Sequence, residues 1–298
     1  MNRKTSAIAC TAALLALCLG SVFAPAQAPS SPVPGPGRSG GGFAADPRAQ
    51  VRTYHFDDAG QDMPYCVFAS SKVSRDKPAP LIVSLHGMGA PPTIMCNPTA
   101  VNLAEEGGYV LVAPMGYSTT GWYGSPVIRM GPGRGPGARP PDAPPATAPA
   151  GPSDEQIQKW SEQDVMNVLA MMRSEFNVDP KRIYLTGHSM GGAGALFLGS
   201  KHADLWAAIA PVAPASFMMN NTRAEILGKI RDAGVPVLLI TGDADEVVPP
   251  ANTRLWAETL KELGMDHVYL EQPGITHGPV ITSSQKEIYD YFSRHVKK

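Results

Sequence analysis

Short apolar runs alternate with longer amphipathic stretches along most of the chain. From the third run onward the apolar residues are nearly continuous, as in Leu81-Ile82-Val83 and Val110-Leu111-Val112. Such runs are typical of strands buried on both faces of a sheet. The predicted strands are Val51–Phe56, Pro64–Ser70, Pro80–His86, Tyr109–Pro114, Arg182–Gly187, Ala207–Val212, Val235–Thr241 and His267–Gln272.

Helical patterns lie between these runs. The clearest spans residues 154–176, where apolar residues recur every three or four positions. Ser153 and Gln156 offer a capping box at its start. Further helices are predicted at 99–107, 190–201, 222–233, 251–263 and 280–295. The alternation predicts an α/β protein with a mostly parallel eight-stranded sheet and helices on both faces, entered through two antiparallel strands.

The first 28 residues have the order of a secretory signal peptide. Arg3 and Lys4 precede an apolar run at 7–19, which is followed by the small-residue sequence Ala26-Gln27-Ala28. We therefore expect a secreted or periplasmic protein; a lipoprotein attached through Cys18 is the alternative. The apolar run is short for a bilayer span and no later stretch is longer, so no integral membrane association is expected.

Two further segments depart from the globular pattern. Residues 29–45 are rich in Pro, Gly and Ser and are expected to form a disordered linker before a catalytic domain at 46–298. Residues 131–152 form a Gly/Pro/Ala-rich tract, expected to be a mobile surface insertion. Loss of residues 1–28 would leave Cys66 and Cys96 in an oxidising compartment. A disulfide between them and two separate buried thiols are both compatible with the sequence.

Composition and charge exclude several classes of protein. Hydrophobic residues make up 43% of the 298 residues and charged residues 17%, which is too apolar for a mostly disordered chain. The 25 Lys and Arg residues nearly balance 26 Asp and Glu residues, and no basic run is present. We therefore expect no nucleic-acid partner.

One pentapeptide carries the strongest chemical signal. Gly187-His188-Ser189-Met190-Gly191 follows a predicted strand and precedes a predicted helix, which is the context of a nucleophile elbow. A serine in such a turn exposes its hydroxyl, and the residues two before and two after it crowd one another unless both are glycine. The letters alone also occur in ordinary turns, and it is the preceding strand that favours a nucleophile.

A serine hydroxyl needs a histidine base that a carboxylate orients. His277 follows the last predicted strand, while Asp243 and Asp245 follow the strand before it, giving the chain order serine, acid, histidine. Either aspartate could instead be a turn residue that accepts backbone N–H groups. His188 is expected to point elsewhere, and His86 to be structural.

Charge that develops on a substrate carbonyl oxygen needs backbone N–H donors. The N–H of Met190, next to the serine, is one candidate. The second is the N–H of Met88 in His86-Gly87-Met88-Gly89, where glycines let the backbone approach a ligand. An ordinary glycine turn is the alternative for this tetrapeptide.

Four residues near predicted strand ends are candidates for an acyl or aromatic pocket. Alternatively, they cap the core. They are Trp122, Tyr123, Phe217 and Met218.

These motifs resemble the α/β-hydrolase superfamily, in particular secreted esterases and predicted peptidases related to feruloyl esterases, polyhydroxybutyrate depolymerases and the prolyl oligopeptidase catalytic domain. The resemblance covers about residues 50–296. It rests on residues 86–89, 182–192 and 242–249 and on His277-Gly278. It implies hydrolysis of small-molecule or polymer carboxylic esters through an acyl-enzyme, without metal or organic cofactor. It also favours Asp245 as the acid.

The chain departs from the family pattern at two points. The tract at 131–152 is not part of the common pattern, and no segment matches the propeller domain of prolyl oligopeptidases. A serine peptidase or amidase with the same three residues is the alternative enzyme. A non-catalytic exported binding protein is a third hypothesis, but its hallmark, a missing member of the serine–acid–histidine set, is not found here.

Overall fold

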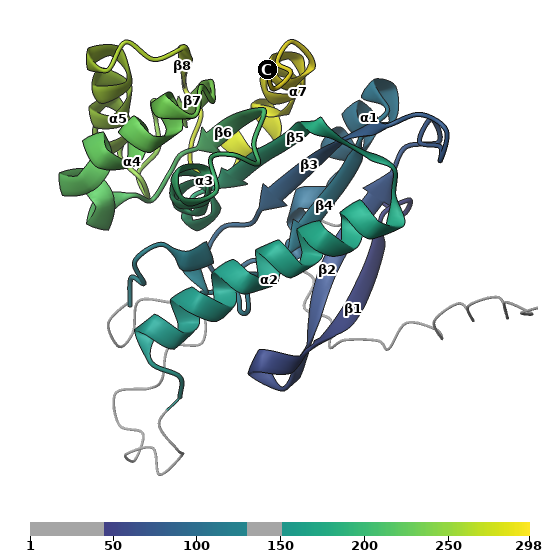
Figure 1. The fold of residues 1–298 in the computed structure, drawn as a ribbon. Coiled ribbons are helices and arrows are strands. Elements are labelled where there is room, and N and C mark those ends of the chain that lie inside the picture. The colour runs from purple at the N-terminus through teal and green to yellow at the C-terminus, as the bar shows by residue number, and fades with distance from the viewer. Residues whose placement is uncertain (1–44, 130–150) are drawn as a thin grey trace, which may run out of the picture. The chain divides into compact units, whose positions relative to one another are not determined.

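The computed structural model describes residues 45–129 and 151–298. The predicted signal peptide, the linker except residue 45, and most of the tract at 131–152 lie outside the described residues. Eight strands form one sheet in the order β1-β2-β4-β3-β5-β6-β7-β8 (Figure 1). Their bounds are β1 Gln50–Phe56, β2 Gln61–Ala69, β3 Ala79–Leu85, β4 Val110–Pro114, β5 Val178–His188, β6 Ala208–Val212, β7 Val237–Gly242 and β8 His267–Gln272.

Strand direction decides where the loops meet. β1 pairs antiparallel with β2, and β2 pairs antiparallel with β4, while every pair from β4 through β3 to β8 is parallel. This confirms the predicted antiparallel entry into a mostly parallel sheet. Because parallel strands place their carboxyl ends at one edge, the loops that follow β3, β5, β7 and β8 gather there.

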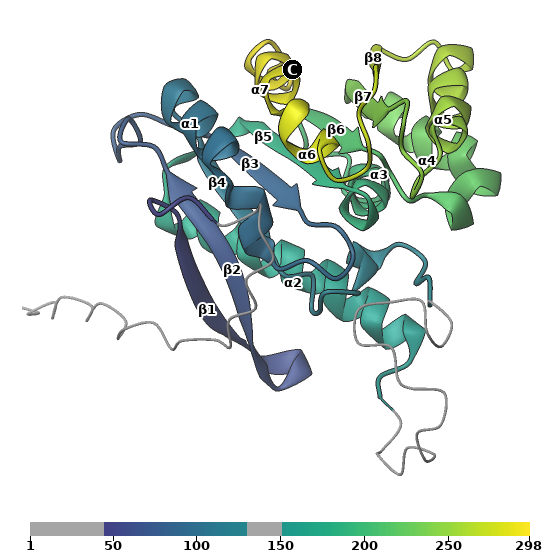
Figure 2. The same cartoon turned by 180° about the vertical axis from the view of Figure 1, so that it is seen from behind.

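Helices cover both faces of the sheet (Figures 1 and 2). One face packs against α2 (Asp154–Glu175), α3 (Met190–Lys201), α4 (Arg223–Asp232) and α5 (Pro250–Glu262). The other packs against α1 (Pro98–Gly107) and α7 (Gln285–Ser293). Neighbouring strand residues alternate between the two cores: Leu81 and Val83 join the first, and Ile82 the second. Burial on both faces explains why the sequence of these strands is continuously apolar.

Most of the predicted helices form, with one difference at the C-terminus. The Ser153 hydroxyl caps α2 by accepting the N–H of Gln156 at 3.2 Å. The segment predicted as one helix at 280–295 contains two, α6 (Val280–Ser283) and α7, which meet at Ser284. The Ser284 hydroxyl donates to the Val280 carbonyl at 2.5 Å. Such a local bond competes with continuous helical bonding, which gives a physical reason for the break.

Cys66 and Cys96 are both buried and free. The disulfide alternative is therefore not confirmed. Both thiols belong to the same core cluster. There, a hydrogen bond with Cys66, together with burial, raises the pKa of the Cys96 thiol. Cys66 lies in β2, and Cys96 ends the short 3-10 helix η2 (Pro92–Cys96).

Candidate active site

Ser189 forms the junction between β5 and α3. Its backbone has φ 59° and ψ −114°, outside the regions that non-glycine residues usually occupy. The turn is held by backbone hydrogen bonds to β6, α3 and the loop after β6. The Ser189 N–H donates to the Val212 carbonyl, and the Ser189 carbonyl accepts from Ala193 and Ala215. Such strain costs about 1–3 kcal/mol and persists only where surrounding structure enforces it. The serine is 8% exposed.

Glycines on each side make this turn possible. A Cβ on Gly187 would lie 2.2 Å from the Gly191 carbonyl oxygen, and a Cβ on Gly191 would lie 2.2 Å from the Leu85 carbonyl oxygen. Both clashes are with backbone that cannot easily move. The predicted crowding around the elbow is therefore confirmed.

His277 and Asp245 are in direct contact at the same edge of the sheet. The Nδ1 atom of His277 lies 2.7 Å from Oδ2 of Asp245. The other oxygen, Oδ1, accepts the N–H groups of Val247 and Val248 at 2.9 and 2.8 Å. These three contacts fix the orientation of the buried Asp245 side chain, and with its oxygen as acceptor, Nδ1 of His277 is the donor in this pair.

Asp243 has a different partner. Its Oδ1 accepts the N–H of Gly274 at 2.6 Å, and the N–H of Ala244 donates to the Ile275 carbonyl. Both bonds tie the loop after β7 to the loop that carries His277. Of the two aspartates that the sequence left open, the structure brings Asp245 to the imidazole and Asp243 to the backbone.

The loop after β3 lies against the serine. A Cβ on Gly87 would be 3.5 Å from the Ser189 Cβ. The Met88 N–H has no acceptor among the described residues, whereas the N–H of Gly89 donates to the Thr119 carbonyl at 2.7 Å. Met190 is the first residue of α3, so its N–H has no acceptor within that helix. The N–H groups of Met88 and Met190 are therefore candidates for binding an anion at this site.

His188 does not point away from the site, contrary to expectation. Its Nε2 lies 2.8 Å from the His277 carbonyl oxygen, and the two imidazole rings are 4.5 Å apart between centroids. Burial, with a smaller effect of His277, lowers the pKa of His188 to about 3. Nothing in the sequence indicates this contact, because it depends on how the end of β5 meets the loop after β8.

His86 is buried, with Nδ1 and Nε2 each 2.9 Å from a backbone carbonyl, of Gly87 and Met115 respectively. Burial lowers its pKa. It supports the backbone beside the serine, as expected of a structural residue.

The four pocket candidates have unequal surroundings. Trp122 and Tyr123 are 3% and 0% exposed, and both belong to the core. The Tyr123 hydroxyl donates to the His86 carbonyl at 3.3 Å. Phe217 and Met218, in the 3-10 helix η4 (Phe217–Thr222) after β6, are 43% and 65% exposed.

Asp164 is a residue that sequence reasoning missed. It is buried on α2 and accepts the Tyr54 hydroxyl at 2.5 Å and the N–H of Gly116 at 2.6 Å. Burial raises its pKa. It holds the loop after β4, whose Thr119 carbonyl in turn binds the Gly89 N–H. An acidic residue on the apolar face of a predicted helix is the signal that could have identified it.

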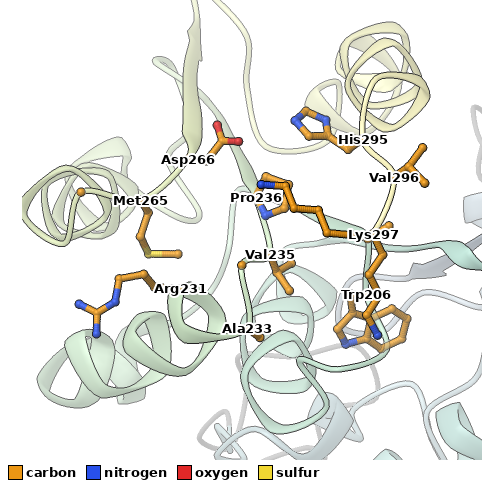
Figure 3. Close-up of a pocket in the computed structure, with 14 residues that line it drawn as sticks. Trp206, Arg231, Ala233, Val235, Pro236, Met265, Asp266, His295, Val296 and Lys297 are labelled. Carbon is orange, nitrogen blue, oxygen red and sulfur yellow. The ribbon is translucent and has the colours of Figure 1, made fainter.

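A separate cavity of about 350 Å³ lies next to the amino ends of β6, β7 and β8; Figure 3 shows the residues that line it. It is lined by residues that precede β6, β7 and β8 and by the C-terminal residues, including Trp206, Pro236, Asp266 and Lys297. Since Ser189, Asp245 and His277 follow the carboxyl ends of their strands, this cavity does not belong to their site.

In residues 45–129 and 151–298, no three His, Cys, Asp or Glu side chains are grouped closely enough to bind a metal ion. No helix in these ranges has the length and apolar character needed to cross a bilayer.

Solved structures share this architecture. A thermostable esterase superimposes with a TM-score of 0.62 at 22% identity, covering 84% of this chain and 63% of that one. A ferulic acid esterase from Anaeromyces mucronatus gives a TM-score of 0.58 at 18% identity, with coverages of 83% and 90%. The fold is that of the α/β-hydrolases, which confirms the predicted fold class.

Curated proteins add sequence evidence. The cutinase est1 of Thermobifida alba is 34% identical over 113 residues, which is 38% of this chain and 35% of the cutinase. The bifunctional acetylxylan esterase/xylanase XynS20E of Neocallimastix patriciarum is 30% identical over 155 residues, covering 51% of this chain and 18% of that protein. The chain thus spans well under two thirds of the length of these relatives.

The fold, together with relatives named as esterases and cutinases, defines the class as the α/β-hydrolases. A sequence profile narrows this class further, because that of the dienelactone hydrolase family matches residues 68–294. The chain belongs to the dienelactone hydrolase family.

Proposed function

We propose that the protein hydrolyses carboxylic esters through an acyl-enzyme, with Ser189 as nucleophile, His277 as base and Asp245 as the acid that orients His277. One observation carries the proposal. The buried Asp245 carboxylate lies 2.7 Å from His277 Nδ1, at the same sheet edge as the strained serine turn. This leaves Nε2 of His277 as the nitrogen available to take a proton.

The reaction proceeds in two halves. Nε2 of His277 takes the Ser189 proton as Oγ attacks the ester carbonyl, and then passes it to the departing alkoxide. Water then attacks the acyl-enzyme in the same way, which releases the carboxylic acid and returns the proton to Ser189. In both halves the N–H groups of Met88 and Met190 stabilise the oxyanion, and Asp245 stabilises the imidazolium.

The proposed substrates are small-molecule or polymer esters with an apolar acyl group. Phe217 and Met218 support this choice, because both are exposed and follow β6 at its carboxyl end. Relatives named as a cutinase and an acetylxylan esterase support the ester class. Trp122 and Tyr123 are buried, so we assign them to packing behind the site.

Replacement of Ser189 tests the proposal. Ser189→Ala should lower nitrophenyl-ester turnover by about 10³-fold or more and abolish labelling by a fluorophosphonate. The melting temperature should stay within about 3 °C, because alanine occupies the same small space. Substantial turnover in this variant would contradict the assignment. Faster cleavage of a matched amide than of the ester by the wild type would favour a peptidase.

We also propose export after removal of residues 1–28, which would give a protein that begins at Pro29. Mass spectrometry of protein from the periplasm and the medium tests this. An intact N-terminus on protein retained in the cytoplasm would contradict it.

A further inference from the structure

His188 lies between the serine turn and the loop that carries His277. A carbonyl oxygen can only accept a hydrogen bond, so Nε2 of His188 carries a proton and donates it to the His277 carbonyl over 2.8 Å. Within the described part of the chain, His188 is the only donor to this carbonyl. The bond therefore ties the base to the strand that bears the nucleophile.

The His188 ring is confined on several sides. It is 5% exposed, and it lies at 46° to the His277 ring with centroids 4.5 Å apart. On another side, a Cβ on Gly87 would lie only 3.1 Å from His188 Nδ1. A side chain packed against the Gly87 loop and the His277 loop at once is suited to hold their separation constant.

The charge of His188 matters as well as its position. Burial, followed by the effect of His277, lowers its pKa to about 3, so the ring stays neutral at the pH where an imidazole base works. Neutral imidazole has one N–H, and in His188 this is the Nε2–H that donates to the His277 carbonyl. His188 therefore neither competes for the serine proton nor places a second positive charge beside the His277 imidazolium.

The remaining contacts of the loop leave a role for such a residue. Asp243 binds the N–H of Gly274, and the Ile275 carbonyl accepts from Ala244. Both anchors precede His277 in the chain, and the carbonyls of its neighbours Thr276 and Gly278 accept from the N–H groups of Val280 and Ile281. The bond from His188 acts on His277 itself.

We propose that His188 is a positioning residue that holds His277 against the end of β5 through its Nε2–H bond to the His277 carbonyl. The inference rests on the proposed function, since His188 acts through His277. Misplacement of a reacting group by about 1 Å can cost about 100-fold in rate, so loss of a single anchor should be measurable.

A matched pair of variants separates the effect of the His188 hydrogen bond from the effect of side-chain volume. The amide of Gln can donate from a similar position, whereas Leu has a similar size and cannot donate. His188→Leu should lower kcat for a nitrophenyl ester by about 10- to 100-fold, with KM unchanged within about twofold. In His188→Gln, kcat should stay within about threefold of the wild-type value.

A second readout does not depend on turnover. The Nδ1 proton shared by His277 and Asp245 should give a downfield proton resonance that persists in wild type and His188→Gln. It should broaden in His188→Leu, because a mobile ring exchanges that proton with water. Melting temperatures of both variants establish that they are folded.

Failure of this inference is distinguishable from failure of the proposed function. If Ser189→Ala is inactive while His188→Leu matches the wild type in kcat and in the downfield resonance, His188 has no positioning role. Equal losses in the Leu and Gln variants would also overturn the proposal, since the hydrogen bond would then be irrelevant. If Ser189→Ala stays active, the proposed function fails instead. The downfield resonance alone then shows whether His188 positions His277.

Discussion

Two carboxylates only two positions apart, Asp243 and Asp245, have different partners. Asp245 contacts an imidazole and two backbone N–H groups, whereas Asp243 contacts the backbone of Gly274. The turn between them sends one side chain toward His277 and the other toward the base of its loop. The proposed role of Asp245 in orienting the base and the role of Asp243 in closing the loop can therefore be separated by experiment.

Asp245→Asn should lower kcat by about 10³- to 10⁴-fold, because an amide can hold the wrong tautomer of His277 and cannot stabilise its charge. Asp243→Asn is the matched control. Its amide oxygen can still accept the Gly274 N–H, so kcat should fall by less than about tenfold. Ester turnover measured on both variants checks this. Equal losses would mean that charge near the loop, and not the contact with His277, is what matters.

At the scale of elements, η4 presents adjacent methionines to different surroundings. Met218 is 65% exposed and Met219 is 3% exposed within the first core cluster. A 3-10 turn points successive side chains in different directions, so one methionine packs and its neighbour faces solvent. This places an apolar side chain on the surface beyond the carboxyl end of β6.

Met218→Ser should raise KM for long-chain acyl esters by about three- to tenfold and leave acetyl esters unaffected, because burial of apolar surface against Met218 would be lost. Met219→Ser is the control for stability. It should lower the free energy of unfolding by about 2–4 kcal/mol, since it empties a core position. Chain-length profiles and denaturation curves test the pair. An equal effect of Met218→Ser on acetyl and long-chain esters would argue against an acyl contact.

For the whole molecule, several shifted pKa values act on stability in the same direction. Burial holds the pKa of His188 at about 3 and also lowers that of His86, so the unfolded chain binds protons that the folded chain does not. Arg254 holds the pKa of Glu271 below its usual value. The stabilisation that this ion pair contributes is therefore lost as pH falls through the folded-state pKa of Glu271. Asp164, whose pKa burial raises, acts in the opposite sense.

Stability should therefore fall as pH drops from about 6.5 toward about 3. Urea denaturation at about pH 7, 5 and 4 measures this, with the midpoint expected to decrease at each step. His188→Gln removes one buried imidazole and should show a shallower decrease. A midpoint independent of pH, or an identical slope in the variant, would contradict the burial of a neutral His188.

The sequence predicted the sheet better than the site. Continuous apolar runs such as Leu81-Ile82-Val83 report burial on both faces directly, and parallel strands determine which edge receives their loops. The contact of His277 with one of two aspartates could be predicted only as alternatives, because it depends on a single turn. The break at Ser284 depends on a side-chain bond that periodicity does not reveal.

Other features depend on tertiary packing. Trp122 and Tyr123 have φ of 63° and 51°, values that nothing in their residue types predicts, and this backbone accompanies their burial in the core. The contact of His188 with His277 joins the end of β5 to the loop after β8, two segments far apart in the chain. Spacing along a sequence carries no information on such a meeting.

The order of the strands has a consequence for biosynthesis. The elbow of Ser189 forms between β5 and α3, in the middle of the sheet, whereas His277 follows β8, the edge strand and the last of these eight strands to be synthesised. On the mechanism proposed here, a nascent chain that has already folded around its nucleophile still lacks a base. The enzyme would thus gain its reactivity only after β8 and His277 have been synthesised, so termination before His277 would yield inert fragments and not unregulated hydrolases.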